Sequence, residues 1–332
     1  MLTLFGTLGP ACADREVLRP MMAAGMDGVR LNLSHTTLQQ SAPWLEELQA
    51  AAALEGVKPL LLVDLQGPEL RIGKVKEPLE YTVGSRVVLG KDGLEVPECL
   101  LPHMHKGQEV LLDDGKLLLK VEVAVPTGAI CRVERGGILQ SRKSIALPGV
   151  EIDSPALTAA DLGNISRAKE YGVGGVMQPF VRGPQDLRAL RLALKAVEAP
   201  EIKIYAKLEN RRGIQQLESL LPEADEMVIA RGDLGNAYPL WELIGVQKDA
   251  AAICRAANKS FMVVTQMLAS MEKSPLPTRA EVSDIFNAVL DGASSLMVTG
   301  ETAVGQYPVQ VMDYLAKTAA QALHWKKENR YE

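Results

Sequence analysis

Short apolar and β-branched runs alternate along the chain with longer stretches in which apolar residues recur at helical spacing. Runs of the first kind are typical of strands, and stretches of the second kind are typical of amphipathic helices. The pattern predicts eight strands, over Leu2–Thr7, Gly28–Leu33, Pro59–Asp64, Gly174–Phe180, Ile202–Lys207, Glu226–Ala230, Phe261–Thr265 and Ser295–Thr299.

A helix is predicted after each of these strands. Alternating strands and helices indicate a parallel sheet with helices outside it, and eight pairs favour a closed barrel over an open sheet. The predicted fold class is therefore α/β, a (β/α)₈ TIM barrel. The predicted helices are Asp14–Ala24, Leu38–Ala53, Ala156–Tyr171, Pro184–Val197, Ile214–Leu221, Leu240–Ala257, Arg279–Asp291 and Pro308–Asn329.

One interval, from Ile72 to about Ile145, departs from this alternation and contains short strand patterns separated by turn residues. A structureless loop of that length would be unusual. We therefore predict a small all-β, barrel-like lid domain over 72–145, inserted after strand three of a catalytic barrel formed by 1–71 and 146–332. Its predicted strands are Thr82–Leu89, Glu109–Leu112, Leu117–Val125 and Ala129–Glu134.

Composition narrows the class of protein. The 332 residues are 47% hydrophobic, enough for a substantial core, and the net charge of −5 argues against nucleic-acid binding through a broad basic surface. No apolar run reaches the roughly 20 residues of a membrane span, and the N-terminus lacks signal-peptide features. Cys12, Cys99, Cys131 and Cys254 show no metal-ligand spacing, so reduced, mostly buried thiols in a cytoplasmic protein are expected.

Polar residues gather where the predicted strands end, which is the rim where barrel enzymes build their sites. Lys207 and Glu209 are two apart and point to the same face. Glu209 and Asp233 offer hard oxygen ligands suited to Mg²⁺ or Mn²⁺, beside which Lys207 can stabilise a phosphoryl group or an enolate oxygen. A salt bridge at a strand end is the alternative interpretation.

A second polar group alternates along the end of predicted strand two. The oxygens of Asn32 and Ser34, with Asp64 on the next strand, can bind a monovalent cation, and Arg30 can hold phosphate bidentately. A hydrogen-bonded rim network explains the same spacing equally well.

Basic residues at the edges of the inserted segment suggest a third group. Arg71 and Lys143 can meet nucleotide phosphates when that domain closes, although isolated basic residues at a boundary are more often solvated. His35 follows the same rim and is a weaker candidate. His103 and His105 have no third ligand and are interpreted as exposed loop residues.

Together these motifs resemble the pyruvate kinase family over essentially the whole chain. Ile204–Asn210 is similar to the family's lysine-bearing signature, and the other matches occur in the family's order and at compatible spacing. They are Arg30–His35, Gly67–Arg71, Ala230–Gly235, Thr265–Met271, Pro277–Glu281 and Gly300–Ala303.

The resemblance implies phosphoryl transfer from phosphoenolpyruvate to ADP, giving pyruvate and ATP. Glu209 and Asp233 would bind the divalent metal, and Lys207 would stabilise the phosphoryl group and the enolate. Thr265 would belong to the proton-delivery system. Arg30 would bind the phosphoryl group, and the amides of Gly232 and Asp233 would bind the substrate carboxylate. Potassium would be bound by Asn32, Ser34, Asp64 and the Leu65 carbonyl, and Glu69 stands at the position associated with potassium dependence. The implied nucleotide contacts are His35, Arg71 and Lys143.

Several positions depart from the family pattern, although no metal ligand is lost. They are Thr36, Leu65, Gln66, Ala146, Pro179, Arg212 and Ala237. Several border the nucleotide or cation sites, which leaves two alternatives open. One is another enolate-type enzyme, a lyase or an enzyme with an altered phosphoryl acceptor, and the other is a non-catalytic regulatory relative.

Family members usually continue into a C-terminal domain with effector sites, whereas this sequence ends after its eighth predicted barrel helix. The expectation is therefore a protein without the usual allosteric control. A homo-oligomer is an expected assembly, and the expected partners are small-molecule substrates without nucleic acid or membrane.

Overall fold

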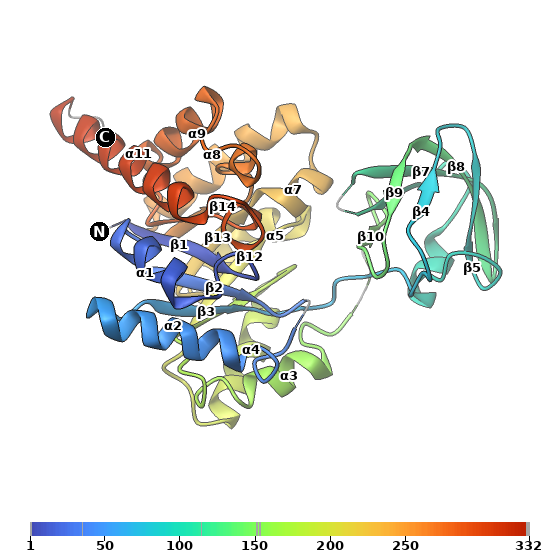
Figure 1. Cartoon of the computed structure of the whole chain (residues 1–332). Helices are drawn as coiled ribbons and strands as arrows, with labels where there is room; N and C mark the ends of the chain where they lie inside the picture. The colour runs from blue at the N-terminus through green and yellow to red at the C-terminus, as the bar shows by residue number, and fades with distance from the viewer. Residues whose placement is uncertain (1, 35, 114, 151, 153, 330–332) are drawn as a thin grey trace. The chain divides into compact units, whose positions relative to one another are not determined.

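The computed structural model describes residues 2–34, 36–113, 115–150, 152 and 154–329. The chain divides into two compact units, unit 1 (Met1–Gly67 with Ala156–Glu332) and unit 2 (Pro68–Pro155) (Figure 1). Unit 2 begins four residues before the predicted inserted segment of 72–145 and ends ten residues after it.

Unit 1 is a closed barrel of eight parallel strands, which confirms the predicted fold class. In space the strands follow the order β1-β15-β14-β13-β12-β11-β3-β2. Their carboxyl ends therefore share one rim, where barrel sites are built. The strands are β1 (Thr3–Leu8), β2 (Gly28–Asn32), β3 (Leu60–Asp64), β11 (Gly175–Gln178), β12 (Lys203–Leu208), β13 (Glu226–Ala230), β14 (Phe261–Val264) and β15 (Ser295–Met297).

Helices lie around the outside of the strands (Figure 1). The third predicted helix ends early because Arg167 and Ala168 hydrogen-bond three residues back, so the chain tightens into turns after Ile165. Short helices that the sequence pattern did not predict follow several strands at the rim. The elements are α1 (Arg15–Ala23), α2 (Ala42–Glu55), α3 (Ala159–Ile165), α4 (Pro184–Ala196), α5 (Arg211–Gln215), α6 (Leu217–Leu220), α7 (Arg231–Ala237), α8 (Leu240–Ala256), the 3₁₀ helix η2 (Ala269–Glu272), α9 (Arg279–Leu290), α10 (Gly300–Ala303) and α11 (Pro308–Glu328).

The barrel interior is packed with side chains from its strands, among them Phe5, Leu62 and Met177. Gly28 on β2 faces the Phe5 ring, and a methyl group at this position would overlap it. Glycine is therefore required here by close approach inside the barrel.

Replacing Gly28 by alanine is expected to destabilise the barrel by about 1–3 kcal/mol, because overpacking forces shifts in a dense core. The urea midpoint of unfolding measures the change. Gly245→Ala in α8, where an added methyl meets nothing within 4 Å, is the matched control and should be neutral or stabilising. A Gly28→Ala midpoint equal to the control's would show that the interior is loosely packed.

A partly buried carboxyl group, that of Glu226, lies at the start of β13. Burial raises the pKa of Glu226 above its ordinary 4.5, and this outweighs the hydroxyl hydrogen bonds that Ser294 and Ser295 donate to its Oε1. At pH values between the unfolded and the folded pKa, the folded state therefore holds a proton that the unfolded state releases. This group's contribution to stability is full below the unfolded pKa and is lost as pH rises through the folded pKa.

Replacing Glu226 by glutamine removes this dependence. We expect the melting temperature of Glu226→Gln to exceed that of the parent by an increasing margin as pH rises from about 4.5 into the neutral range. Thermal melts across that range measure it. Glu170→Gln, at an exposed carboxylate that accepts from Arg167, is the control. A difference in melting temperature that stays constant or shrinks as pH rises would contradict a raised pKa for Glu226 in the folded state.

Unit 2 consists of a five-stranded sheet, in the order β10-β6-β7-β8-β5, and a two-stranded sheet of β4 and β9. Only the second half of the predicted strand Thr82–Leu89 is a strand, because the chain turns before Arg86, where Gly84 takes a φ of +86° and the Ser85 amide donates back to the Thr82 carbonyl. The elements are β4 (Leu79–Tyr81), β5 (Arg86–Gly90), the 3₁₀ helix η1 (Glu98–His103), β6 (Glu109–Leu112), β7 (Leu117–Val125), β8 (Gly128–Arg135), β9 (Gly137–Leu139) and β10 (Ile145–Ala146).

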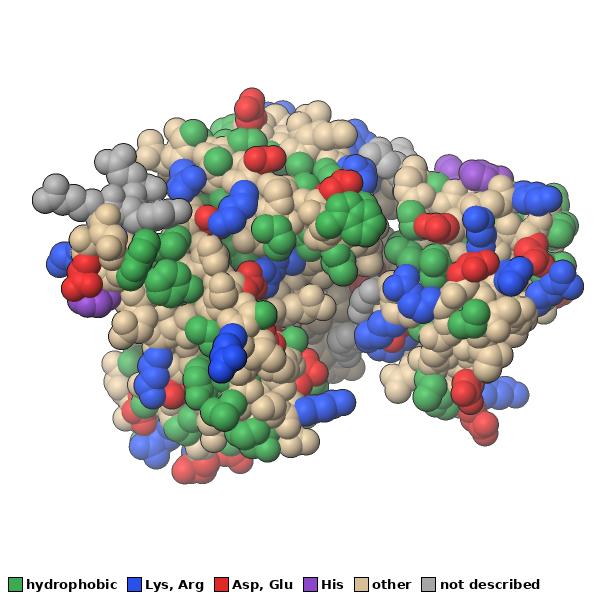
Figure 2. Space-filling model, turned by 90° about the horizontal axis from the view of Figure 1, so that it is seen from above, with side chains coloured by type: hydrophobic (Ala, Val, Ile, Leu, Met, Phe, Trp, Pro, Cys, Tyr) green, Lys and Arg blue, Asp and Glu red, His purple; other side chains and the backbone are tan. Residues whose placement is uncertain are grey.

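The surface of each unit carries charges of both signs. On the face shown in Figure 2, basic and acidic side chains are interspersed among the described residues. Three cysteines are buried and Cys99 is exposed, and all four are free thiols. Among the described helices, none has the length and apolarity needed to cross a membrane.

Candidate active site

Lys207, near the end of β12, lies between two carboxylates at the barrel rim. Its Nζ is 2.7 Å from Glu209 Oε1 and 3.2 Å from Asp64 Oδ2, and the Lys207 side chain is only 12% exposed. The contact with Glu209 is an ion pair without hydrogen-bond geometry. Burial alone would lower the pKa of Lys207, but the charges of Asp64 and Glu209 outweigh it and hold the pKa above its ordinary value. Lys207 is therefore a fixed ammonium at neutral pH.

Arg30 on β2 converges on the same carboxylate. Its Nε donates to Asp64 Oδ2 over 2.9 Å, and its Nη2 lies 2.7 Å from that atom. Burial raises the pKa of Asp64, but the charges of Lys207 and Arg30 bring it below its usual value. Two cations thus share one oxygen, while Asp64 Oδ1 is buried and has no hydrogen-bond partner among the described residues.

Glu209 is also held from the segment that follows the neighbouring strand β11. Its Oε2 accepts from the Phe180 amide over 2.8 Å. Asp233 on α7 contributes to the raised pKa of Lys207, so its charge acts on the same ammonium. Among the described residues, no three His, Cys, Asp or Glu side chains form a metal-binding group.

The residues predicted to surround potassium flank Asp64. Asn32 and Asp64 are partners in the β2–β3 register, and Asn32 Oδ1 accepts from the Ser34 amide over 3.1 Å. The Leu65 amide donates to the Met177 carbonyl over 3.1 Å. His35, the weakest nucleotide candidate, lies outside the described residues.

Thr265, directly after β14, has an unusual backbone. Its φ is +76° and that of Gln266 is +54°. The left-handed region is unfavourable for a β-branched residue and is occupied mostly where surrounding contacts impose it. Thr265 Oγ1 accepts from the Gly232 amide over 2.8 Å and donates to the Val264 carbonyl over 2.6 Å. The hydroxyl is therefore held in one orientation.

Two glutamates to which the sequence analysis gave no role, the buried Glu301 and the partly buried Glu281, hold the loop after Thr265. Glu301 Oε1 accepts from the Leu268 amide over 3.1 Å, and Glu281 Oε1 accepts from the Ser270 amide over 2.7 Å. Glu281 also forms a capping box with Thr278 at the start of α9. The Thr-x-x-Glu spacing was the available sign of this second anchor.

The two predicted nucleotide contacts in unit 2 lie on paired segments. Arg71 and Ser144 pair through their backbones in an isolated antiparallel β-bridge, and the Ile72 amide donates to the Lys143 carbonyl. Each side chain already has an acidic partner: Arg71 Nη2 is 2.6 Å from Glu69 Oε2, and Lys143 Nζ is 2.8 Å from Asp113 Oδ1.

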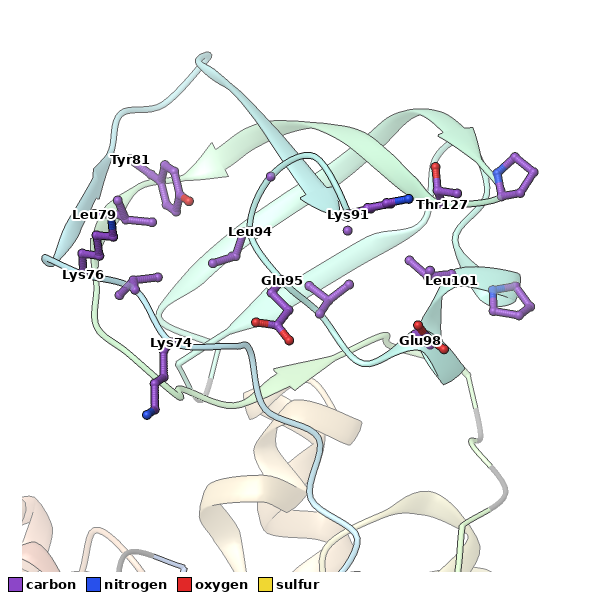
Figure 3. A pocket seen from close by; sticks show the side chains of 16 residues that line it. Lys74, Lys76, Leu79, Tyr81, Lys91, Leu94, Glu95, Glu98, Leu101 and Thr127 are labelled. Atoms are coloured by element: carbon purple, nitrogen blue, oxygen red, sulfur yellow. The ribbon is translucent and has the colours of Figure 1, made fainter.

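Unit 2 also contains an open groove of about 1070 Å³. Figure 3 shows Tyr81 and Leu79 on one side of the groove and Thr127 and Leu101 on the other. Neither Arg71 nor Lys143 lines this groove, so it is separate from the predicted nucleotide contacts.

Comparison with known proteins identifies what this chain is similar to. The family model "Pyruvate kinase, barrel domain" matches residues 2–312. A pyruvate kinase from Bacillus licheniformis is 35% identical over 97% of this chain and 57% of its own length. The pyruvate kinase of Aeropyrum pernix is 35% identical over 96% of this chain and 70% of its own length. Pyruvate kinase PKLR from Homo sapiens is 35% identical over 93% of this chain and 58% of its own length. The chain thus spans little more than half of two of these three relatives.

Proposed function

The chain belongs to the pyruvate kinase family, and from this we propose that it transfers a phosphoryl group from phosphoenolpyruvate to ADP, giving pyruvate and ATP. The observation that carries the proposal is the buried ammonium of Lys207, placed between Asp64 and Glu209 with Arg30 beside them. Fixed cations in a water-poor site stabilise charge that develops during phosphoryl transfer.

In this reaction a terminal oxygen of ADP attacks phosphorus, and the bond from phosphorus to the enol oxygen breaks. The electron pair of that bond remains on the enolate. Arg30 binds the phosphoryl oxygens, and Lys207 stabilises the group in transfer and the enolate oxygen left behind. The enolate carbon then accepts a proton, which yields pyruvate.

Glu209 and Asp233 would hold Mg²⁺ or Mn²⁺, which when bound supplies positive charge to substrate oxygens. The donor set fits such an ion, because hard divalent cations prefer carboxylate oxygens and commonly take few of them from the protein. Both Glu209 oxygens have a contact, yet each carboxylate oxygen retains a further lone pair.

Asn32, Ser34, Asp64 and the Leu65 carbonyl would hold potassium. The buried Asp64 Oδ1, without a hydrogen-bond partner among the described residues, supports this proposal because a buried polar atom is otherwise expected to be paired. Glu69, at the position associated with potassium dependence, supports a requirement for this ion, although it also pairs with Arg71.

Thr265 would act at the enolate carbon as part of the proton-delivery system. The amides of Gly232 and Asp233 would bind the substrate carboxylate, and binding there would replace the contact that the Gly232 amide now makes with Thr265 Oγ1. His35, Arg71 and Lys143 would face the nucleotide.

The enzyme would act in the cytoplasm, with a homo-oligomer as the proposed assembly.

A second function is favoured by one observation: Arg71 and Lys143 are both ion-paired within unit 2. With Thr36, Gln66 and Ala146 departing from the family pattern, nucleotide contacts could be weak while the enolate chemistry remains. A lyase-type enzyme acting on pyruvate would then exchange pyruvate methyl protons without nucleotide or phosphate. Absence of that exchange would count against it.

The main proposal is tested with pure protein, phosphoenolpyruvate, Mg²⁺ and K⁺, with pyruvate formation coupled to a reporter enzyme. Several nucleoside diphosphates are offered as acceptors, and Lys207→Met gives the background. Turnover above that background with any of them supports phosphoryl transfer. No activity above background across the series would reject it, and failure to bind Mn²⁺ or phosphoenolpyruvate would favour a non-catalytic relative.

A further inference from the structure

Arg231, the first residue of α7, is a buried cation at the barrel rim that the proposed function leaves without a role. Its side chain is 7% exposed. Nη1 lies 2.7 and 2.6 Å from the two carboxylate oxygens of Asp284 on α9. Nη2 donates to the Thr265 carbonyl over 2.6 Å and contacts Met267 Sδ at 2.9 Å. One guanidinium therefore ties α7 and α9 to the loop that carries Thr265.

Thr265 is held at two atoms by two consecutive residues. Arg231 binds its carbonyl, and the Gly232 amide binds its hydroxyl. These contacts lie next to the left-handed φ angles of Thr265 and Gln266. Strained backbone persists only where surrounding contacts over-determine it, and Arg231 supplies one of these contacts with the five-donor geometry that only arginine has.

We propose that Arg231, fixed by Asp284, is a positioning residue that sets the Thr265 hydroxyl for proton transfer to the enolate carbon. This inference rests on the proposed function. In the step concerned, the carbon–carbon double-bond pair forms the new C–H bond, the enolate oxygen re-forms the carbonyl, and a solvent proton passes through the hydroxyl. Arg231 touches neither substrate nor reacting atoms in this scheme and acts through Thr265.

The competing explanation is that Arg231 and Asp284 form only a structural salt bridge. The chain offers a matched comparison for it. Arg191 Nη2 binds Asp225 over 2.8 Å, and its Nη1 donates to the Ile202 carbonyl over 3.1 Å. This arginine joins a carboxylate to a backbone carbonyl as Arg231 does, but at the opposite end of the barrel strands. Arg191→Met therefore reports what loss of such a bridge does away from the site.

The first measurement is the threonine methyl NMR spectrum of the whole chain, with the Thr265 resonance assigned through Thr265→Val. We expect Arg231→Met and the folded, conservative Arg231→Lys to move that resonance, and Arg191→Met to leave it in place. A Thr265 resonance unchanged in Arg231→Met, or moved as much by Arg191→Met, overturns the proposal whether or not the protein is an enzyme.

The second measurement is a double-mutant cycle on pyruvate methyl-proton exchange. Arg231→Met should slow exchange by about 100-fold, as misplacement of a reacting group does, with little change in the KM for pyruvate. Combined with Thr265→Val it should add almost nothing. Additive losses overturn the proposal. A parent protein with neither exchange nor phosphoryl transfer would instead reject the proposed function, and the NMR result would still decide whether Arg231 positions Thr265.

Discussion

Replacing Lys207 by methionine is expected to lower the turnover of phosphoenolpyruvate by at least about 1,000-fold, roughly 4 kcal/mol of transition-state stabilisation. Removing a single hydrogen-bond donor from an oxyanion site already costs 100- to 1,000-fold. Lys207 is more than such a donor, because it is a full charge, only 12% exposed, and flanked by Asp64 and Glu209. Methionine keeps much of the length of the side chain and removes only the ammonium function.

The measurement is kcat and KM for phosphoenolpyruvate under saturating Mg²⁺ and K⁺. We expect kcat to fall far more than substrate affinity, as it does when an interaction made in the transition state is removed. Lys203→Met is the control, because Lys203 starts the same strand at the other end of the barrel and is exposed. A Lys207→Met kcat within tenfold of the parent would assign the chemistry to other residues.

The barrel could be predicted from the sequence because its eight strands are short apolar runs, each followed by a helical pattern. Glu226–Ala230 was predicted with the bounds that the structure has. The side-chain period of two also placed Lys207 and Glu209 on one face, and the structure brings the two into contact. Local periodicity thus predicts where strands lie and which of their side chains share a face.

Contacts between distant segments could not be predicted in the same way. Arg30 and Asp64 lie on neighbouring strands, yet the sequence left open whether they bind each other or separate ligands. Arg231 meets Asp284 across 53 positions, and no local pattern marks that pair. The left-handed backbone at Thr265 and Gln266 also gave no sign, because neither residue is the glycine that usually indicates such a conformation.

Asp64 shows why the two kinds of information must be combined. The sequence suggested a potassium ligand, whereas the structure gives Oδ2 to Arg30 and Lys207 and leaves Oδ1 without a hydrogen-bond partner among the described residues. These roles are compatible, because one oxygen can balance the two cations while the other faces an ion. Asp64 is then the carboxylate that pairs with both Lys207 and Arg30, the arginine proposed to bind the phosphoryl group.

Replacing Asp64 by alanine should therefore reduce stability by about 3–5 kcal/mol, because it leaves buried charge uncompensated. Arg30 would lose its described partner, and Lys207 would keep its ion pair with Glu209 and the more distant charge of Asp233. Urea unfolding measures the change. Asp313→Ala, which breaks an exposed pair with Lys317, is the control and should change stability by only about 0–1 kcal/mol.

The decisive comparison repeats Asp64→Ala in the Lys207→Met protein. If Asp64 stabilises the fold by neutralising two cations, removing one of them first makes its own loss less damaging, so the two effects should be less than additive. The Lys207–Glu209 pair is present in both proteins that keep Lys207 and absent from both Lys207→Met proteins, so its contribution cancels from the comparison. Additive losses would mean that Asp64 and Lys207 are not energetically coupled despite their 3.2 Å contact, and that Asp64 serves Arg30 alone.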